Sequence, residues 1–391
     1  MRWRLSHSYN RRILSMSPDS LSPQKTMSPQ VSVIIPARNE EACLAACLRS
    51  ITSQPGAEFE VIVVDDQSSD GTRQIAQSFP GVKVMSAGEL PAGWSGKCNA
   101  VWTGANIARG QWLLFTDADT VHLPGSLLRT LQEAQREGVA LLSYSPEQEV
   151  RGLLQWAVMP AIFAELASTY PPSAVCDPKS PVAAANGQYL LISREAYDAV
   201  GGHRAVASSL LEDLELAKLV KATGRRIRLR YGKGLVRTRM YRDARSLIEG
   251  WSKNLALLFP HTMQLAFVRM AEFAVIVGGV AVAIWAAAHR ADLLTYVSAR
   301  EFVLGVVALG ALAWMRVLKR IRRAHFGLLA ELLAPLGLPI FSYLLLRSRL
   351  YYRWRKNLTW KGRAYCPDPP SSNGSPSASQ AASARGAQSS I

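Results

Sequence analysis

Short β-branched runs alternate with helix-like stretches from residue 31 to about residue 260, and this alternation is the strongest constraint on the fold. The predicted strands are residues 31–35, 59–64, 82–84, 111–115 and 139–143. The stretches between them carry apolar residues at helical spacing. This rhythm is typical of a parallel or mixed sheet covered by helices on both faces. The sequence therefore predicts an α/β fold.

Polar residues gather where these strands end. The pairs that follow the first, second and fourth strands are, in order, Asn39 and Glu40, Asp65 and Asp66, and Asp117 and Asp119. Sheets of this kind bind ligands beyond the carboxyl ends of their strands. We therefore expect these side chains to face one site. Asn39 is also expected to cap the following helix, whose apolar stripe is Leu44, Leu48 and Ile51.

Asp117 and Asp119 lie one residue apart at the end of a buried strand. Two carboxylates in this spacing can aim at one point and supply hard oxygen ligands for Mg²⁺ or Mn²⁺. Such an ion would hold a diphosphate and neutralise its charge as it leaves. An isolated pair of this kind is more often a surface turn, so the interpretation depends on the neighbouring motifs.

Two further motifs suit a nucleotide. Asp65 and Asp66 follow an apolar strand and can reach the ring N–H and ribose hydroxyls, although acids here can also belong to a turn that caps the next helix. For Asp70 we prefer that structural interpretation. Lys97 stands in a glycine-flanked loop before a helix, where it can meet a phosphate or be a solvated loop residue.

Glu212 and Asp213 precede a predicted helix over residues 214–223. A carboxylate at a helix N-terminus is often only a cap, but of two adjacent acids one can serve as general base. Cations and aromatic residues, among them Arg239, Arg242 and Trp251, lie ahead of the first long apolar segment. They can contact the diphosphate of a bound nucleotide, or they can form a belt of residues at the interface between membrane and water.

Three long apolar stretches follow, at residues 271–288, 302–318 and 326–346, and each approaches the ~20 residues of a membrane helix. Residues 290–365 carry 14 Lys+Arg against 3 Asp+Glu, whereas residues 31–289 carry 25 against 24. Basic residues beside apolar segments indicate the anionic cytoplasmic leaflet rather than nucleic acid. A third crossing would leave the basic segment after it outside. We therefore favour a re-entrant or interfacial hairpin, broken at residues 335–339, over a third span.

The chain is expected to divide into five segments. They are a disordered lead at 1–30, a catalytic domain at 31–260, membrane helices at 265–350, a basic juxtamembrane segment at 351–365 and a disordered tail at 366–391. The lead has no apolar run of the kind that a secretory signal needs. Within the catalytic domain, the apolar segment 153–167 could guide an acceptor at the membrane or be a plain core helix.

Together the motifs resemble glycosyltransferase family 2, the inverting enzymes with a GT-A fold, over about residues 31–260. The matching segments, in the family's order, are residues 33–40, 64–72, 117–119, 186–188 and 212–213. The resemblance implies a Rossmann-like mixed sheet and a nucleotide-sugar donor, usually a UDP-sugar. The Gln-x-x-Arg-Trp box of processive polysaccharide synthases is missing, which favours a single transfer over polymer synthesis.

The resemblance also implies roles for individual residues. Asp213 would be the catalytic base beside Glu212, and Asp119 would bind the metal with Asp117 nearer the ribose. The donor-binding set is Pro36, Ala37, Asn39, Glu40, Asp66, Lys97, Asp117, Arg239 and Arg242. The acceptor set is Asn186, Gly187, Gln188 and Trp251.

The C-terminal membrane segments and the boxes at 250–254 and 360–365 resemble bacterial lipid glycosyltransferases, nearest to those for carotenoid acids and hopanoids. We therefore predict a metal-dependent, inverting hexosyltransferase of the bacterial inner membrane. It would pass sugar to a lipid on the cytosolic face and would not bind nucleic acid. An acceptor that is a carboxylic acid would depend less on the base. The alternatives are transfer to a polyprenyl phosphate, with cations from residues 225–245, and a membrane-anchored nucleotide-binding protein without turnover.

Overall fold

The computed structural model describes residues 29–289, 297–354, 358–360 and 363–365. Its main sheet has seven strands in the order β3-β2-β1-β4-β8-β6-β9. In chain order they are β1 Val31–Ala37, β2 Phe59–Asp65, β3 Val82–Ser86, β4 Trp112–Phe115, β6 Leu141–Ser145, β8 Leu190–Ser193 and β9 Ile227–Tyr231. Strand β8 is antiparallel to both neighbours, and the other pairs are parallel. The mixed α/β sheet predicted from the sequence is confirmed.

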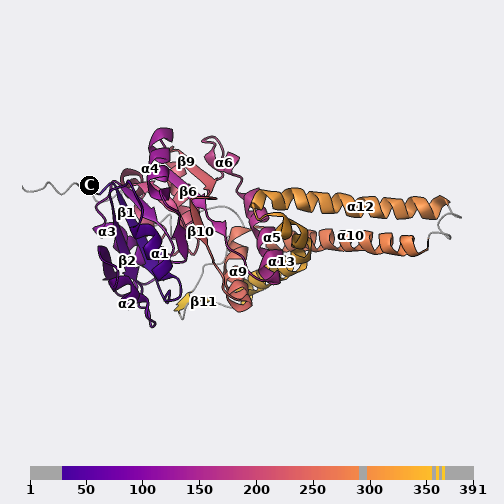
Figure 1. The fold of residues 1–391 in the computed structure, drawn as a ribbon, viewed down its shortest axis with the longest axis horizontal. Coiled ribbons are helices and arrows are strands. Elements are labelled where there is room, and N and C mark those ends of the chain that lie inside the picture. The colour runs from indigo at the N-terminus through magenta and orange to yellow at the C-terminus, as the bar shows by residue number, and fades with distance from the viewer. Residues whose placement is uncertain (1–28, 290–296, 355–357, 361–362, 366–391) are drawn as a thin grey trace, which may run out of the picture.

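Helices cover both faces of this sheet (Figure 1). Val31, Val33 and Ile35 of β1 pack in one cluster with α1, α2 and α4, whereas Ile34 packs in another with α3, α6, α7 and α8. The helices are α1 Leu44–Thr52, α2 Thr72–Gln77, α3 Gly96–Ile107, α4 Ser126–Glu137, α6 Pro172–Cys176, α7 Arg194–Ala199 and α8 Glu212–Ala222, with a short 3-10 turn, η1, at Gly202–Arg204. The strand ends therefore form a rigid platform for the polar side chains that follow them.

A second, three-stranded sheet in the order β5-β10-β7 stands at that edge. It consists of β5 Thr120–His122, β7 Glu147–Gln148 and β10 Val236–Thr238. Thr238 pairs with Thr120 in antiparallel register, so the residues just outside this pair, Asp119 and Arg239, are brought to the same end of the ladder. A distant part of the chain thereby reaches the acidic turn after β4.

Asn39 does not cap α1, and that prediction was wrong. The N-cap is Cys43, while Asn39 has a φ of 53° and its Oδ1 accepts a hydrogen bond of 2.9 Å from the backbone N–H of Ser69. Asparagine tolerates the left-handed region better than most residues. Asn39 therefore ties the turn after β1 to the turn after β2.

The C-terminal part of the chain is helical. Its helices are α9 Ala244–Leu258, α10 Thr262–Ala288, α12 Val297–Ile321 and α13 Leu328–Trp354, with a 3-10 turn, η2, at Arg322–Ala324 and a two-stranded hairpin of β11 Leu358–Trp360 and β12 Arg363–Tyr365. In Figure 1, α10 and α12 project side by side from the α/β domain, and α9, α13 and α5 (Leu153–Thr169) lie at the junction. The described residues hold three helices that are long and apolar enough to cross a membrane.

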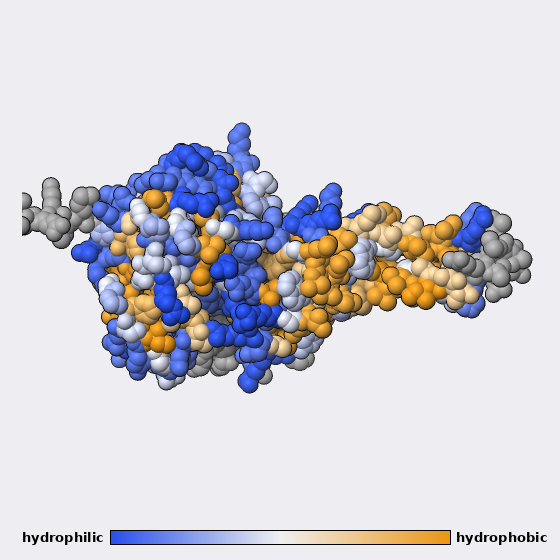
Figure 2. Space-filling model, in the orientation of Figure 1, coloured by the Kyte–Doolittle hydropathy of each residue, from blue (hydrophilic) through white to orange (hydrophobic). Residues whose placement is uncertain are grey.

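The projecting pair has the surface of a membrane hairpin. Figure 2 shows it mostly hydrophobic, in contrast to the hydrophilic α/β domain. Exposed apolar side chains run along α10 from Met263 to Trp285, which at 1.5 Å per residue is about 33 Å, close to the hydrocarbon thickness of a bilayer. The two charges inside this stretch turn inward. Arg269 pairs with Glu165 of α5 at 3.0 Å, and Glu272 pairs with Arg320 of α12 at 2.7 Å.

Helix α13 does not form the hairpin that we expected at residues 335–339. It is one continuous helix that contains both Pro335 and Pro339. Half of its most apolar window is buried inside the protein, against 11% for α10 and 17% for α12. Near its C-terminal end, Arg347 donates to Ser252 of α9 at 3.0 Å, and Ser348 accepts from the Ala256 N–H at 2.8 Å. Close packing against protein compensates for the prolines, as neighbouring helices do for prolines in membrane helices.

Candidate active site

One cavity of about 1970 Å³ opens beyond the carboxyl ends of the strands. Asp65, which we expected to face this site, does not line it: its Oδ1 accepts a hydrogen bond of 3.2 Å from the Ser68 N–H, and its carboxylate pairs with Arg73 at 3.5 Å. The other residues that the sequence assigned to the site all line it. These residues are Pro36, Ala37, Asn39, Glu40, Asp66, Lys97, Asp117, Asp119, Asn186, Gly187, Gln188, Glu212, Asp213, Arg239, Arg242 and Trp251. Segments up to 215 residues apart in the chain therefore converge on one space.

Lys97 lies among the acids. Its ammonium is 2.9 Å from Asp117 Oδ1 and 2.7 Å from Glu212 Oε1. Burial lowers the pKa of Lys97, but the charges of Asp117, Glu212 and Asp213 outweigh it and raise the pKa well above its usual value. The lysine is therefore protonated, and it neutralises acids that would otherwise repel one another. The same ammonium is positioned to meet a phosphate that enters this space.

The carboxylate of Asp213 is held by backbone donors. Its Oδ2 accepts a hydrogen bond of 2.7 Å from the Gly187 N–H, and its Oδ1 accepts one of 2.8 Å from the Leu214 N–H. Burial, followed by the charge of Glu212, raises the pKa of Asp213 to about 6, while Lys97 and the two N–H groups oppose that rise. Each oxygen keeps a further lone pair, and the carboxylate is ionised near neutral pH, which are the properties that a general base requires.

Gly187 allows these groups to approach one another. A Cβ atom at this position would lie 3.1 Å from Lys97 Nζ and 3.4 Å from Asp213 Oδ2. Any side chain here would therefore enter the space between the lysine and the base.

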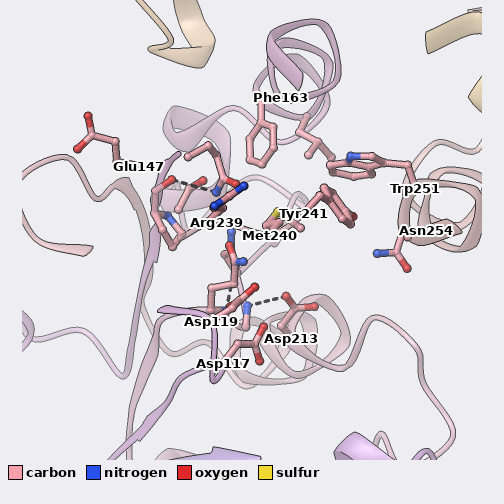
Figure 3. Close-up of a pocket in the computed structure, with 18 of the residues that line it drawn as sticks. Asp117, Asp119, Glu147, Phe163, Asp213, Arg239, Met240, Tyr241, Trp251 and Asn254 are labelled. Carbon is pink, nitrogen blue, oxygen red and sulfur yellow. Dashed lines mark hydrogen bonds between the residues drawn. The ribbon is translucent and has the colours of Figure 1, made fainter. Parts of the chain in front are cut away.

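Asp117 and Asp119 stand on the turn between β4 and β5, on the same side of the cavity as Asp213 (Figure 3). Burial raises the pKa of the Cys47 thiol behind them, and the charges of Asp119, Asp117 and Glu40 raise it further. Within the described part of the chain, no group of three or more His, Cys, Asp or Glu side chains forms a closed metal site. Two carboxylates fit an open site, in which Mg²⁺ or Mn²⁺ would complete its shell with diphosphate oxygens and water.

The turn after β1 and the turn after β2 hold each other in place. The Glu40 N–H donates to Thr72 Oγ1 at 2.7 Å, and Arg38 donates to the Asp66 carbonyl at 2.6 Å. Asp70 accepts from the Thr72 N–H at 3.0 Å and from the Glu41 N–H at 3.1 Å, so its predicted structural role in the turn is confirmed.

Two residues that we predicted to contact a ligand also contact other parts of the protein. Trp251 is 3% exposed, and its indole N–H is 3.3 Å from the Met159 sulfur, so much of this side chain is core. Arg242, just before α9, donates to the Ala42 carbonyl at 2.6 Å and so connects the start of α9 to the segment between β1 and α1.

Apolar side chains gather in the part of the cavity farther from the acids, and only one feature of the sequence pointed to them. In Figure 3, Phe163, Met240, Tyr241 and Trp251 gather on the side away from Asp117, Asp119 and Asp213. Further apolar lining comes from α5, with Trp156 and Leu166, and from the residues just before and at the start of α13, namely Phe326, Leu328 and Leu329. The apolar segment 153–167 had suggested a wall on α5, but nothing in the sequence pointed to Phe326.

A mixed sheet of this order, with paired acids after β4 and a second acid pair at the start of α8, defines a glycosyltransferase with a GT-A fold. The model of the family described as Glycosyl transferase family 2 matches residues 32–201. The chain is 30% identical over 278 residues to 4,4'-diaponeurosporenoate glycosyltransferase of Staphylococcus haemolyticus, over 67% of this chain and 71% of that relative. The chain belongs to glycosyltransferase family 2.

The chain is also similar to other proteins. The enzyme of the same name from Staphylococcus aureus strain USA300 is 29% identical over 234 residues, which is 58% of this chain and 60% of that relative. A mannosyltransferase from Pyrobaculum calidifontis, solved with GDP-Man and Mn²⁺, aligns with a TM-score of 0.49 and 18% identity over 86% of this chain and 91% of that one. A glucosyl-3-phosphoglycerate synthase from Mycobacterium tuberculosis aligns with a TM-score of 0.40 and 23% identity, over 59% and 79% of the two chains.

Proposed function

We propose that this glycosyltransferase passes a hexose from a UDP-sugar to a membrane lipid, with inversion at the anomeric carbon. The observation that carries the proposal is the single cavity. One end of it holds the acids and Lys97, and the other end is lined by α5 and by the start of α13. The names of the two staphylococcal relatives support a carotenoid acid, or a lipid of similar shape, as the acceptor.

The reaction is one in-line displacement. The acceptor oxygen attacks the anomeric carbon while Asp213 takes up its proton, if it carries one, and the bond to the nucleoside diphosphate breaks on the opposite face. Lys97, Arg239 and Arg242 supply positive charge to the departing diphosphate. Mg²⁺ or Mn²⁺, held by Asp119 with Asp117, would neutralise that diphosphate when bound.

The alternative acceptor, a polyprenyl phosphate, is less well supported. It requires cations from residues 225–245 at the site, but most of those arginines form ion pairs. The pairs are Arg225–Glu195, Arg228–Glu137, Arg230–Glu133, Arg230–Glu137, Arg237–Glu149 and Arg245–Glu249. A protein without turnover would not need Asp213 to be oriented by two N–H donors.

The packing of α13 supports a membrane topology. We propose that α10 and α12 cross the inner membrane of a bacterium and that α13 stays on the cytoplasmic side with the catalytic domain. Both ends of α13 contact that side, since Phe326 just before it meets Phe163 of α5, and Ser348 bonds α9. This arrangement leaves Arg322 and Arg347 on one side of the membrane, as the positive-inside rule requires.

The anomeric configuration of the product tests the proposal. Purified protein in lipid nanodiscs would be incubated with UDP-glucose, Mn²⁺ and a C30 polyene acid, and the product would be examined by proton NMR. A β-linked glucose from the α-linked donor is expected, together with loss of transfer after chelation with EDTA. An α-linked product would contradict inversion, and undiminished transfer in EDTA would contradict the metal.

A further inference from the structure

The cavity has an apolar end at the junction with the membrane helices. On one side stand Trp156 and Phe163 of α5, and on the other stand Phe326 and Leu329, just before and in the first turn of α13. The rings of Phe163 and Phe326 meet edge to face, with their centroids 5.7 Å apart. Helix α5 and the segment Phe326–Leu329 therefore meet and form two adjoining apolar walls of the cavity.

The turn between α12 and α13 is fixed to the catalytic domain. The ring of His325 stacks on Tyr231, at the end of β9, with a centroid separation of 4.3 Å. The Tyr231 hydroxyl also donates to the His325 carbonyl at 3.3 Å. His325 and Gly327 have φ values of 60° and 62°, which turn the chain sharply before α13 begins. The second wall is therefore set by the catalytic domain as well as by the membrane helices.

The outside of this end of the cavity is also apolar. Leu328, Leu329, Leu332 and Leu336 follow one another along α13, with exposed fractions of 69%, 55%, 51% and 58%. On a protein with a membrane hairpin, a contiguous surface of leucines is expected to contact the lipid of the bilayer. Arg322 and Arg323 lie in η2, the turn that precedes α13. They are exposed and also line the cavity, and arginines at such a position are typical of the lipid headgroup layer. The cavity therefore opens where headgroups give way to acyl chains.

From these observations we propose that the apolar end of the cavity, where α5 meets Phe326–Leu329, is a lateral portal for the acceptor. The apolar chain of the acceptor lies along these two walls and extends into the bilayer, while its polar end reaches Asp213. The inference rests on the proposed transfer to a lipid. It adds that the acceptor never leaves the membrane, and that Phe163, Phe326 and Leu329 contact its apolar chain.

A narrowing variant and a matched control test the portal. Leu329→Trp adds bulk at the wall, whereas Leu332→Trp adds the same bulk one turn along α13, at an exposed residue that does not line the cavity. With a C30 polyene acid in nanodiscs, Leu329→Trp should raise KM at least about tenfold, and Leu332→Trp should leave it unchanged. On a short, water-soluble polyene acid with the same head group, Leu329→Trp should raise KM much less than it does on the C30 acid.

The outcomes separate the portal from the function. Absence of transfer to either acceptor by the wild-type protein would overturn the proposed function itself. Equal KM values for the two variants, or equal loss on the long and the short acceptor, would overturn the portal. A second measurement does not depend on any variant. A C30 acid with a diazirine midway along its chain should crosslink in the wild-type protein to α5 or to residues 326–336, and crosslinks confined to other helices would overturn the portal.

Discussion

Replacing Asp213 with Asn tests the catalytic base with little change of shape. The amide oxygen can still accept the 2.7 Å hydrogen bond from the Gly187 N–H, so the start of α8 should keep its place. What is lost is the ability to take up the acceptor's proton. Positioned general bases contribute roughly 10²- to 10⁴-fold to a rate, so turnover with a hydroxyl acceptor should fall by about that factor.

The pKa of Asp213 predicts how strongly the rate depends on pH. The base must be ionised, so the rate is lost as the pH falls through the pKa of about 6. Between about pH 7 and about pH 5 the ionised fraction falls from about 0.9 to about 0.09, and the rate with a hydroxyl acceptor should fall about tenfold. In Asp213→Asn this acid limb should disappear.

The assay follows label from a UDP-sugar into a lipid alcohol and into a lipid acid, side by side. The acid arrives already ionised and should be affected less by the substitution. Glu215→Gln is the matched control, because Glu215 lies on the same first turn of α8 but faces solvent and pairs with Lys218. An Asp213→Asn enzyme that keeps its rate on the alcohol, or keeps the acid limb, would refute the assignment of the base.

Two further predictions concern the metal and the membrane hairpin. Asp119→Ala should weaken Mn²⁺-dependent binding of UDP by at least about tenfold in calorimetry, whereas Asp213→Asn should leave it largely intact; equal losses would contradict the division of roles. Gly279→Ala should lower the thermal midpoint in detergent, because its Cβ would lie 2.8 Å from the Cα of Gly310 on α12, at a cost of about 1–3 kcal/mol. Gly278→Ala, which meets nothing within 4 Å, should not lower it, and matching midpoints would contradict the close helix crossing.

Patterns over a few consecutive residues were enough to predict the parts of the fold that depend mainly on neighbouring residues. The strand runs and the acids at their ends were readable because side-chain alternation and strand-end placement follow from a few consecutive residues. The convergence of Asp119 and Asp213 followed from the family resemblance, and the cavity contains both residues.

The errors lie where distant contacts decide the local structure. Asn39 was expected to cap a helix, but its side chain binds the Ser69 N–H thirty residues away. The prolines at 335 and 339 suggested a break, but packing against α5 and α9 keeps α13 continuous. The contact between Phe163 and Phe326 joins two unrelated segments, so no periodicity or motif could have predicted it.

Transfer of labelled sugar into lipid by purified protein tests the central claim most directly. Nanodiscs that contain the wild-type chain, Mn²⁺ and a long-chain lipid acceptor would receive labelled UDP-sugar, and the organic phase would be counted beside an Asp119→Ala control. Lipid-soluble label that appears with the wild-type chain and is absent with the control is the expected result. Label that stays entirely in the aqueous phase, with every UDP-sugar tried, would contradict a site that joins a nucleotide-sugar to a membrane lipid.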